Sequence, residues 1–204
     1  MRVHCATRRS MHQGFKVEVR GLQARKELME KNWSSTSLPY VLPKSDGQAD
    51  AWSDDTSGQR TSQHLLEVAE VTPPARIASA LALEQGERVV VRRRLMKRGD
   101  RPVELTDSYY PLTVAAGTAL AERRKIKGGA PTLLAELGYQ PRRVTEEVET
   151  RRPSASEIAS LELEPGEPVL VLCRLTTAQN GSPMEASLMT MRQGAILRYE
   201  IEVA

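Results

Sequence analysis

The pattern of apolar and polar positions divides the chain near residue 65. Residues 32–63 are rich in Ser, Asp, Gly and Pro and hold few aliphatic side chains, a composition typical of a linker. From Leu65 onward, apolar residues recur at about every second position in short segments bounded by turn residues, which predicts β-strands. We therefore expect residues 1–64 to form a polar, largely flexible leader and residues 65–204 to form one domain.

The same pattern of residues occurs twice in that domain. Residues 77–95 read IASALALEQGERVVVRRRL, and residues 158–175 read IASLELEPGEPVLVLCRL. The match extends upstream, where Glu67-Val68 corresponds to Glu147-Val148, and downstream, where Glu104 corresponds to Glu185. Each unit is about 45 residues long and the two lie about 80 residues apart, too long a period and too few copies for a solenoid. A duplicated supersecondary unit is the better interpretation.

Each unit predicts a strand, a short helix and a β-hairpin. The first strands are expected at 65–72 and 144–152, and the hairpins begin with the β-branched runs 88–95 and 168–176. The second helix, at 154–163, starts with Ser154 and Glu157 at capping-box spacing, and glycines at 86 and 166 are expected to end the two helices. Helices are also expected at 115–125 and 131–137, and a last strand at 196–203. The predicted fold class is α+β, with an antiparallel sheet of about six to seven strands and short helices.

Charge and residue counts restrict the possible functions. The net charge of +3 divides into +5 for residues 1–38, −2 for residues 39–64 and zero for residues 65–204. The neutral domain argues against a general polyanion-binding surface, whereas the leader fits either a solvated tail or a nucleic-acid contact. All three histidines lie in the first third, so a histidine-based metal or catalytic site in the domain is excluded, and we expect no metal and no cofactor.

The expected location of the chain is the cytoplasm. The chain has no run of 18 apolar residues and no apolar segment at its N-terminus, so we expect neither a membrane span nor a secretory signal. Two cysteines, Cys5 and Cys173, do not make a disulfide framework, and a reducing cytoplasm is the default. Cys173 lies in an apolar run and is expected to be an inert, buried thiol.

Three consecutive arginines occupy the middle of a predicted strand. Alternation places Arg92 and Arg94 on one face of the sheet and Arg93 on the other. Two guanidinium groups on an inner face need compensating partners, because a buried charge is costly. Either they bind an anionic ligand, which suits the forked geometry of arginine, or they form salt bridges on a solvent-facing sheet.

Other polar positions have weaker signals. Glu104 and Glu185 occupy the same place in the two units and are expected to flank one cleft, as an acid–base pair or as surface carboxylates. Gly128-Gly129 precedes a predicted helix and either presents N–H groups to an anion or is a plain loop, and Thr132 could add a hydroxyl. The tyrosines Tyr109, Tyr110 and Tyr199 fit core or cleft-wall positions.

Together these segments resemble the UTRA domain, the effector-binding half of GntR transcriptional regulators of the HutC subfamily. The resemblance rests on VVVRRRLMKRGDRPVE at 89–104, SYYP at 108–111, GGAPTLLAELGYQP at 128–141, EEVETRRPSASEIASLELEPGEPVLVLCRL at 146–175 and LRYEI at 197–201. It implies a chorismate lyase-like fold and a small polar or anionic effector, a sugar phosphate or carboxylate, held between the sheet and residues 112–142. It also implies a homodimer in which binding of the effector alters DNA binding by linked domains.

The resemblance assigns roles to residues at matching positions. It gives Arg92 and Arg94 to an anion, and it gives Glu104 and Glu185 to ligand hydroxyls or to bridges with the arginines. Gly128, Gly129, Thr132 and Tyr199 complete the expected ligand-binding set, and no residue is expected to be catalytic. Many relatives have a tyrosine or serine after the glycines, where this sequence has Ala130-Pro131-Thr132.

The N-terminal part departs from the family pattern. The Leu-Pro-Ser-Glu segment and the Val-Ser-Arg-x-Thr-Val-Arg recognition helix of GntR regulators do not occur in residues 1–64. We therefore expect the winged-helix domain to be missing from this chain, so that DNA is contacted only indirectly or through a partner domain. The alternatives are a chorismate lyase-like enzyme acting on a small aromatic or carboxylate substrate, or a truncated remnant that does not bind DNA.

Overall fold

The computed structural model describes residues 33–35, 38–44, 52 and 60–199. They fall into two compact parts, of which the smaller contains the parallel pair β1 (Trp33–Ser35) and β8 (Ala195–Leu197). Only the first part of the strand expected at 196–203 is seen in β8, and residues 200–203 lie outside the described residues. The flexible leader expected at 1–64 lies mostly outside them too, as does any winged helix there.

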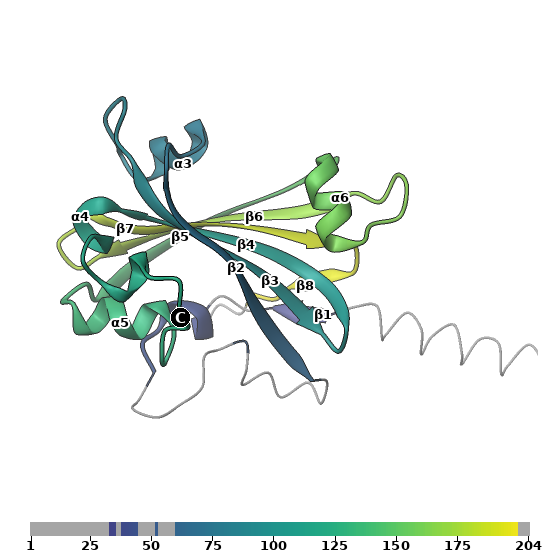
Figure 1. Cartoon of the computed structure of the whole chain (residues 1–204), viewed down its shortest axis with the longest axis horizontal. Helices are drawn as coiled ribbons and strands as arrows, with labels where there is room; N and C mark the ends of the chain where they lie inside the picture. Colours follow the sequence, from purple (N-terminus) through teal and green to yellow (C-terminus); the bar gives the residue numbers. More distant parts are fainter. Residues whose placement is uncertain (1–32, 36–37, 45–51, 53–59, 200–204) are drawn as a thin grey trace, which may run out of the picture. The chain divides into compact units, whose positions relative to one another are not determined.

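The larger part is built on one antiparallel sheet of six strands. Their order across the sheet is β2-β3-β4-β7-β6-β5, and Figure 1 shows the sheet with helices on both sides. The strands are β2 (Thr61–Val71), β3 (Val89–Arg98), β4 (Arg101–Pro111), β5 (Pro141–Arg151), β6 (Val169–Ala178) and β7 (Pro183–Arg192). The predicted α+β class is confirmed. The domain boundary expected at Leu65 stays a prediction. The strand β2 begins four residues before it, and α2 (Leu38–Val41) also belongs to the larger part.

Strand pairing follows the internal duplication. The first unit is β2, α3 (Ala75–Ala80), β3 and β4, and the second is β5, α6 (Ala155–Leu161), β6 and β7. The two units meet where β4 pairs with β7, with Ser108 opposite Ser187. Corresponding residues have corresponding partners: Arg94 lies opposite Thr106 as Arg174 lies opposite Ser187.

The two faces of the sheet are covered by different helices. α3 and α6 cover one face, where Ile77 packs against Val89 and Val91, and Leu161 packs against Val169 and Val171. On the other face, Val90 and Tyr110 pack against the connection between the two units, residues 112–140. Strand alternation therefore decides which residues of β3 face this connection, and Arg92 and Arg94 follow Val90 onto it.

The helix expected at 115–125 is wrong. The chain instead forms α4 (Leu112–Ala115) and, after a break, the 3₁₀ helix η1 (Ala119–Ala121). Ala116 is extended and Gly117 has φ +71°, so the helix cannot continue through them. The helix α5 (Ala130–Glu136) is confirmed, with Pro131 in its first turn. Within the described part of the chain, no helix is long and apolar enough to cross a membrane.

Both α3 and α6 end before the glycines that were expected to stop them. Each helix is followed by a non-glycine residue in the left-handed conformation, Ala82 and Glu162, both with φ +52°. The amide of the next residue then bonds back into the helix, from Leu83 to Ala78 and from Leu163 to Ile158, at 3.0 Å in both units. Such caps are normally built on glycine, because a Cβ crowds the backbone at positive φ.

This cap predicts a stabilising substitution. We expect Ala82→Gly to raise the free energy of unfolding by about 0.5–1 kcal/mol, because glycine adopts the left-handed conformation without strain. Urea unfolding would measure it. Ala78→Gly, inside α3, is the matched control and should lower the same quantity by about 0.5–1 kcal/mol. A loss of stability in Ala82→Gly would contradict the strained-cap interpretation.

The start of α6 generates a pH-dependent prediction. The predicted capping box of Ser154 and Glu157 is present, and Arg151 donates two hydrogen bonds to the Glu157 carboxylate, at 2.8 and 2.6 Å. Hydrogen bonding to Arg151 is the main cause that lowers the pKa of Glu157 from 4.5 to about 2. A carboxylate with a lowered pKa stabilises the fold above its unfolded pKa, and this contribution is lost as the pH falls from about 5 to about 2.

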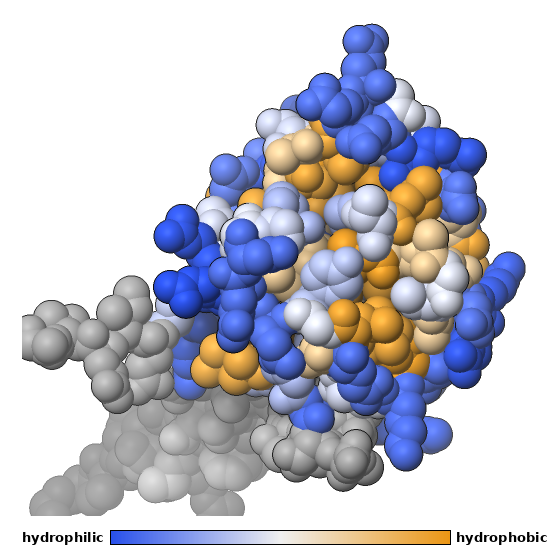
Figure 2. All heavy atoms as spheres, turned by 90° about the vertical axis from the view of Figure 1, so that its left-hand side faces the viewer, coloured by the Kyte–Doolittle hydropathy of each residue, from blue (hydrophilic) through white to orange (hydrophobic). Residues whose placement is uncertain are grey.

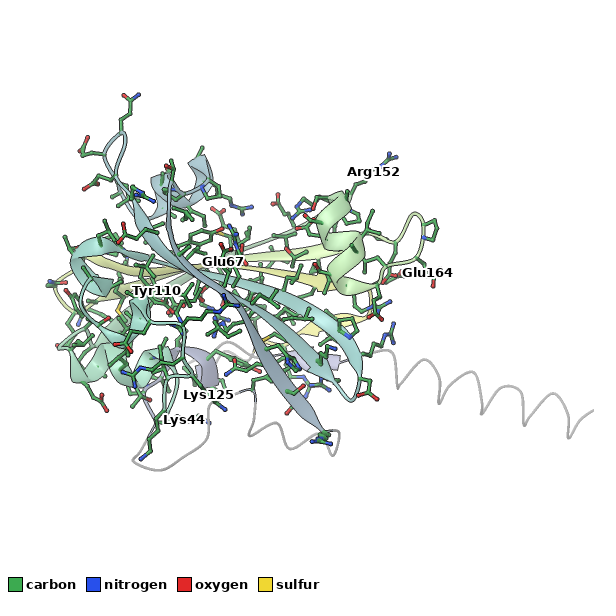
Figure 3. The ribbon with its side chains drawn as sticks, in the orientation of Figure 1. Lys44, Glu67, Tyr110, Lys125, Arg152 and Glu164 are labelled. Carbon is green, nitrogen blue, oxygen red and sulfur yellow. The ribbon has the colours of Figure 1, made fainter. Side chains whose placement is uncertain are left out.

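Glu157→Gln should therefore lower the free energy of unfolding by about 1–2 kcal/mol at pH 7, and this difference from the wild type should shrink as the pH falls toward 2. Denaturant unfolding at pH 7, 5 and 3 measures it. Glu164, in the turn after α6 (Figure 3), has an exposed side chain and supplies the control Glu164→Gln. A pH-independent difference would show that the ion pair with Arg151 contributes nothing.

Candidate functional site

A cavity of about 200 Å³ lies between the sheet and the connection of the two units. It is lined by residues of β2 and β3 and by the loop that leads into α5: Gln63, Leu65, Arg92, Arg94, Lys125, Ile126, Gly129 and Ala130. Three of these residues are cationic and none is a carboxylate. The described residues thus provide a positively charged cavity on the face where Arg92 and Arg94 were predicted to lie together.

Arg92 holds residues 119–124 against β3 by hydrogen bonds to their backbone. We call this segment the roof of the cavity and the set of hydrogen bonds the Arg92 clamp. Arg92 Nη1 donates to the carbonyl oxygens of Ala119, Leu120 and Glu122, at 2.8–3.2 Å, and its Nη2 donates to that of Arg124 at 2.7 Å. Burial lowers the pKa of the guanidinium from its usual value. Most of its donor capacity is therefore spent on holding η1 and the loop after it against β3.

Arg94 is placed differently from Arg92. Its Nη2 donates to Ser108 Oγ at 2.6 Å, and that hydroxyl lies 2.8 Å from Ser187 Oγ, which donates to Glu185 Oε1 at 2.8 Å. The Nε of Arg94 is buried and has no hydrogen-bond partner among the described residues. A buried guanidinium donor without an acceptor is unfavourable, and Arg192 Nε shares this state, but Arg192 does not line the cavity. Arg94 thus lines the cavity and keeps a buried donor without an acceptor.

The second unit shows what a satisfied arginine looks like at the corresponding position. Arg174 donates from Nε to Glu146 Oε1 at 2.6 Å, and both side chains are over 90% buried. Glu146 lies opposite Arg174 in the sheet, whereas the residue opposite Arg94 is Leu65. The first unit thus has an apolar side chain and a cavity at the place where the second unit has a carboxylate.

Alternation of the three arginines is confirmed. Arg93 lies on the other face, where Nη1 donates to Glu67 Oε2 at 2.5 Å and Nε donates to Asp107 Oδ2 at 3.2 Å. The salt-bridge interpretation therefore fits Arg93. It does not fit Arg92 or Arg94, since neither forms an ion pair with a described residue.

The two glutamates lie on the arginine face but do not line the cavity. Glu104 is buried and accepts a hydrogen bond from Thr106 Oγ1; burial raises the pKa of its carboxyl, against this hydrogen bond and the charges of Arg174 and Arg94. Glu185 also accepts a hydrogen bond from Tyr110, at 3.2 Å. Burial, followed by the negative charge of Glu185, raises the pKa of Tyr110. Glu185 is thus connected to Arg94 through two serines, whereas Glu104 acts within the sheet.

The remaining predicted residues are placed as follows. Gly128 and Gly129 have φ of +72° and +85°, and the Gly129 amide donates to Ile126 O at 3.1 Å, as in a plain loop. Thr132 Oγ1 donates to Gly128 O at 2.9 Å and accepts from the Lys44 amide at 3.1 Å. Tyr199 is 56% exposed and donates to Glu146 Oε2 at 2.8 Å, so it lies beside the Arg174 pair and not beside Arg94.

Sequence reasoning missed part of the cavity wall. Lys125 and Ile126 are separated from Gly128-Gly129 only by Lys127, so their proximity to the glycines was a usable signal, whereas Gln63 lies in a segment interpreted as linker. The predictions for the buried residues hold: Tyr109, Tyr110 and Cys173 are 2%, 0% and 6% exposed. Burial raises the pKa of the Cys173 thiol, as an inert cysteine requires.

Solved structures share this fold. A GntR-family transcriptional regulator superposes with a TM-score of 0.69 at 21% identity, over 92% of this chain and 82% of its own. The ligand-binding domain of a GntR-family regulator from Bordetella bronchiseptica superposes with a TM-score of 0.59 at 26% identity, over 71% of this chain and 92% of its own.

Sequence comparison agrees with the structural likeness. An uncharacterized HTH-type transcriptional regulator of Streptomyces coelicolor is 34% identical over 132 residues, which are 63% of this chain and 49% of the relative. The chain therefore matches about half the length of that relative. The family model of the UTRA domain matches residues 56–196. Because this match spans well over half of the residues, the chain belongs to the UTRA domain family.

Proposed function

We propose that this chain is the effector-binding domain of a GntR-family transcriptional regulator and that a small anion binds to Arg94 in the cavity. The observation that carries the proposal is the difference between the two units. Arg174 has its carboxylate in Glu146, whereas Arg94 has a buried Nε without an acceptor and faces a cavity beside Leu65. The anionic group of the effector takes the place that the Glu146 carboxylate has in the second unit.

The charges around the cavity support an anionic effector. Lys125 and the two arginines line it, and a carboxylate or phosphate there gains charge-assisted hydrogen bonds. The serines Ser108 and Ser187 connect Arg94 to Glu185, which orients the guanidinium before a ligand arrives. A preoriented donor costs less conformational entropy on binding.

Regulation follows from differential affinity. An effector that binds one arrangement of the domain more tightly shifts the population toward it, and linked DNA-binding domains respond to that shift. DNA binding through such a domain and assembly into a homodimer remain part of the proposal. We also propose a non-catalytic role, because the relatives that this chain matches are transcriptional regulators.

The first test uses the neighbouring arginines. In a thermal-shift screen of sugar phosphates and small carboxylates, an anion that binds should raise the melting temperature of the wild type, since it binds only the folded state. Arg94→Gln should abolish this shift, whereas Arg93→Gln, on the opposite face, should retain it. A screen without any hit, or a shift that survives in Arg94→Gln, would contradict the proposal.

Arg92 should behave as a structural residue. Arg92→Gln leaves four backbone carbonyls without their charged donor, and we expect it to lower the free energy of unfolding by about 2–3 kcal/mol. Hydrogen exchange of the ligand-free variant should show faster exchange in residues 119–126. Unchanged exchange there would mean that the clamp does not hold the roof.

The second test supplies the missing carboxylate. Leu65→Glu places a carboxylate opposite Arg94, as Glu146 lies opposite Arg174. This variant should lose the ligand-induced shift in melting temperature while staying folded, because its own carboxylate occupies the site. Leu65→Gln, which has the same shape without the charge, is the control and should retain part of the shift. Full ligand response in Leu65→Glu would show that the anion does not bind beside Arg94.

A further inference from the structure

A second, smaller cavity adjoins the first at Arg94. It has a volume of about 80 Å³ and shares four lining residues with the first cavity, namely Gln63, Arg94, Gly129 and Ala130. Arg94 therefore borders both spaces. A ligand whose anionic group binds Arg94 can extend from there into the second cavity.

The walls of the second cavity differ chemically from those of the first. Six of its lining residues have apolar or aromatic side chains, Pro39, Tyr40, Leu42, Trp52, Met96 and Pro131. The cationic residues that line it are Lys44 and Arg94. Figure 3 shows Lys44 and Lys125 on the side of the sheet where α5 lies. Figure 2, which views the end of the molecule at the left of Figure 1, shows apolar areas interrupted by polar ones. The first cavity has three cationic lining residues, and the second adds a group of apolar and aromatic ones.

This apolar wall comes from a separate segment of the chain, the residues 38–44 and 52 that precede β2. It is attached to the domain at defined points. The Lys44 amide donates to Thr132 Oγ1 at 3.1 Å, and Trp52, which is 3% exposed, donates from Nε1 to Ser62 O at 3.0 Å. Arg98 also lies over the Trp52 ring, at 5.9 Å from its centroid. The wall is therefore held in place.

Leu42 has a special position in this wall. It lines the cavity and is 47% exposed, although it is a large aliphatic side chain. An apolar group placed against Leu42 and Tyr40 removes apolar surface from water, which is favourable by about 25 cal/mol for each Å². A sugar at the same place loses hydration of the hydroxyls that meet Leu42 and the ring of Tyr40, which is unfavourable.

We propose that the effector of this domain is a two-part molecule, an anion that carries an apolar or aromatic group. The carboxylate or phosphate binds Arg94 and Lys125, and the apolar group packs against Tyr40 and Leu42. This inference rests on the proposed function, because it takes the anion to be bound at Arg94. The sequence predicts either a sugar phosphate or a carboxylate. This inference disfavours sugar phosphates and favours carboxylates or phosphates that carry an aryl or alkyl group.

Calorimetric titration of the full chain with three probes tests the ligand class. The probes are inorganic phosphate, glycerol 3-phosphate and phenyl phosphate, which share the anion and differ in what it carries. Phenyl phosphate should bind at least about tenfold more tightly than glycerol 3-phosphate, because only its ring is buried favourably in the second cavity. Acetate and phenylacetate form a parallel pair and should show the same order.

Variants assign that preference to the wall. Leu42→Asn should remove most of the advantage of phenyl phosphate and leave the affinity for inorganic phosphate unchanged. Ile158→Asn, on α6 and 43% exposed, is the matched control and should change neither affinity. Hydrogen exchange adds an independent readout, since phenyl phosphate should protect residues 38–44 more than inorganic phosphate does.

The outcomes separate this inference from the proposed function. If all three probes bind through Arg94 with equal affinity, or if Leu42→Asn weakens them equally, the two-part ligand is wrong and the anion site stands. If glycerol 3-phosphate binds more tightly than phenyl phosphate, the ligand class is wrong in the same way. If no probe binds, or if Arg94→Gln binds them as the wild type does, the proposed function and this inference are both overturned.

Discussion

Each guanidinium buried on the inner face of this sheet needs hydrogen-bond acceptors. Among the described residues, two of the three arginines on this face have them and the third has them only in part. Arg92 takes four backbone carbonyls of the η1 segment, and Arg174 takes the carboxylate of Glu146. Arg94 takes one serine hydroxyl and keeps a buried Nε without an acceptor. The roof of the cavity, its charge and its open donor all follow from how these three requirements are met.

Duplication explains why the comparison between Arg94 and Arg174 is meaningful. The two arginines have the same place in the two units, and the β4–β7 pairing brings the units into one sheet. Two local differences separate an internal ion pair from a cavity: the first unit has a register shift between Leu65 and Glu67, and it places Leu65 opposite its arginine where the second unit places Glu146. The connection over residues 112–140 then covers the unit that lacks the carboxylate. A structural ion pair and a ligand site are thus two outcomes of one arrangement.

Much of this architecture could be predicted from the sequence, because strand alternation and the repeat are local patterns. They placed Arg92 and Arg94 together, set Arg93 on the other face and matched Glu67 with Glu147, as the strand register confirms. The broken helix at Gly117 and the early ends of α3 and α6 depend on backbone angles that propensities do not reveal. The clamp made by Arg92 and the wall at Trp52 depend on contacts between segments far apart in the chain, for which one sequence carries no signal.

The most direct measurement of the central claim is the NMR signal of the arginine Nε–H groups during titration with an anion that binds. Arg94 Nε–H should shift on titration and exchange more slowly with solvent, because it gains an acceptor. Arg174 Nε–H should remain unchanged, since Glu146 already accepts its hydrogen bond. A response at Arg174, or an Arg94 signal that stays unchanged while the anion binds, would contradict the account.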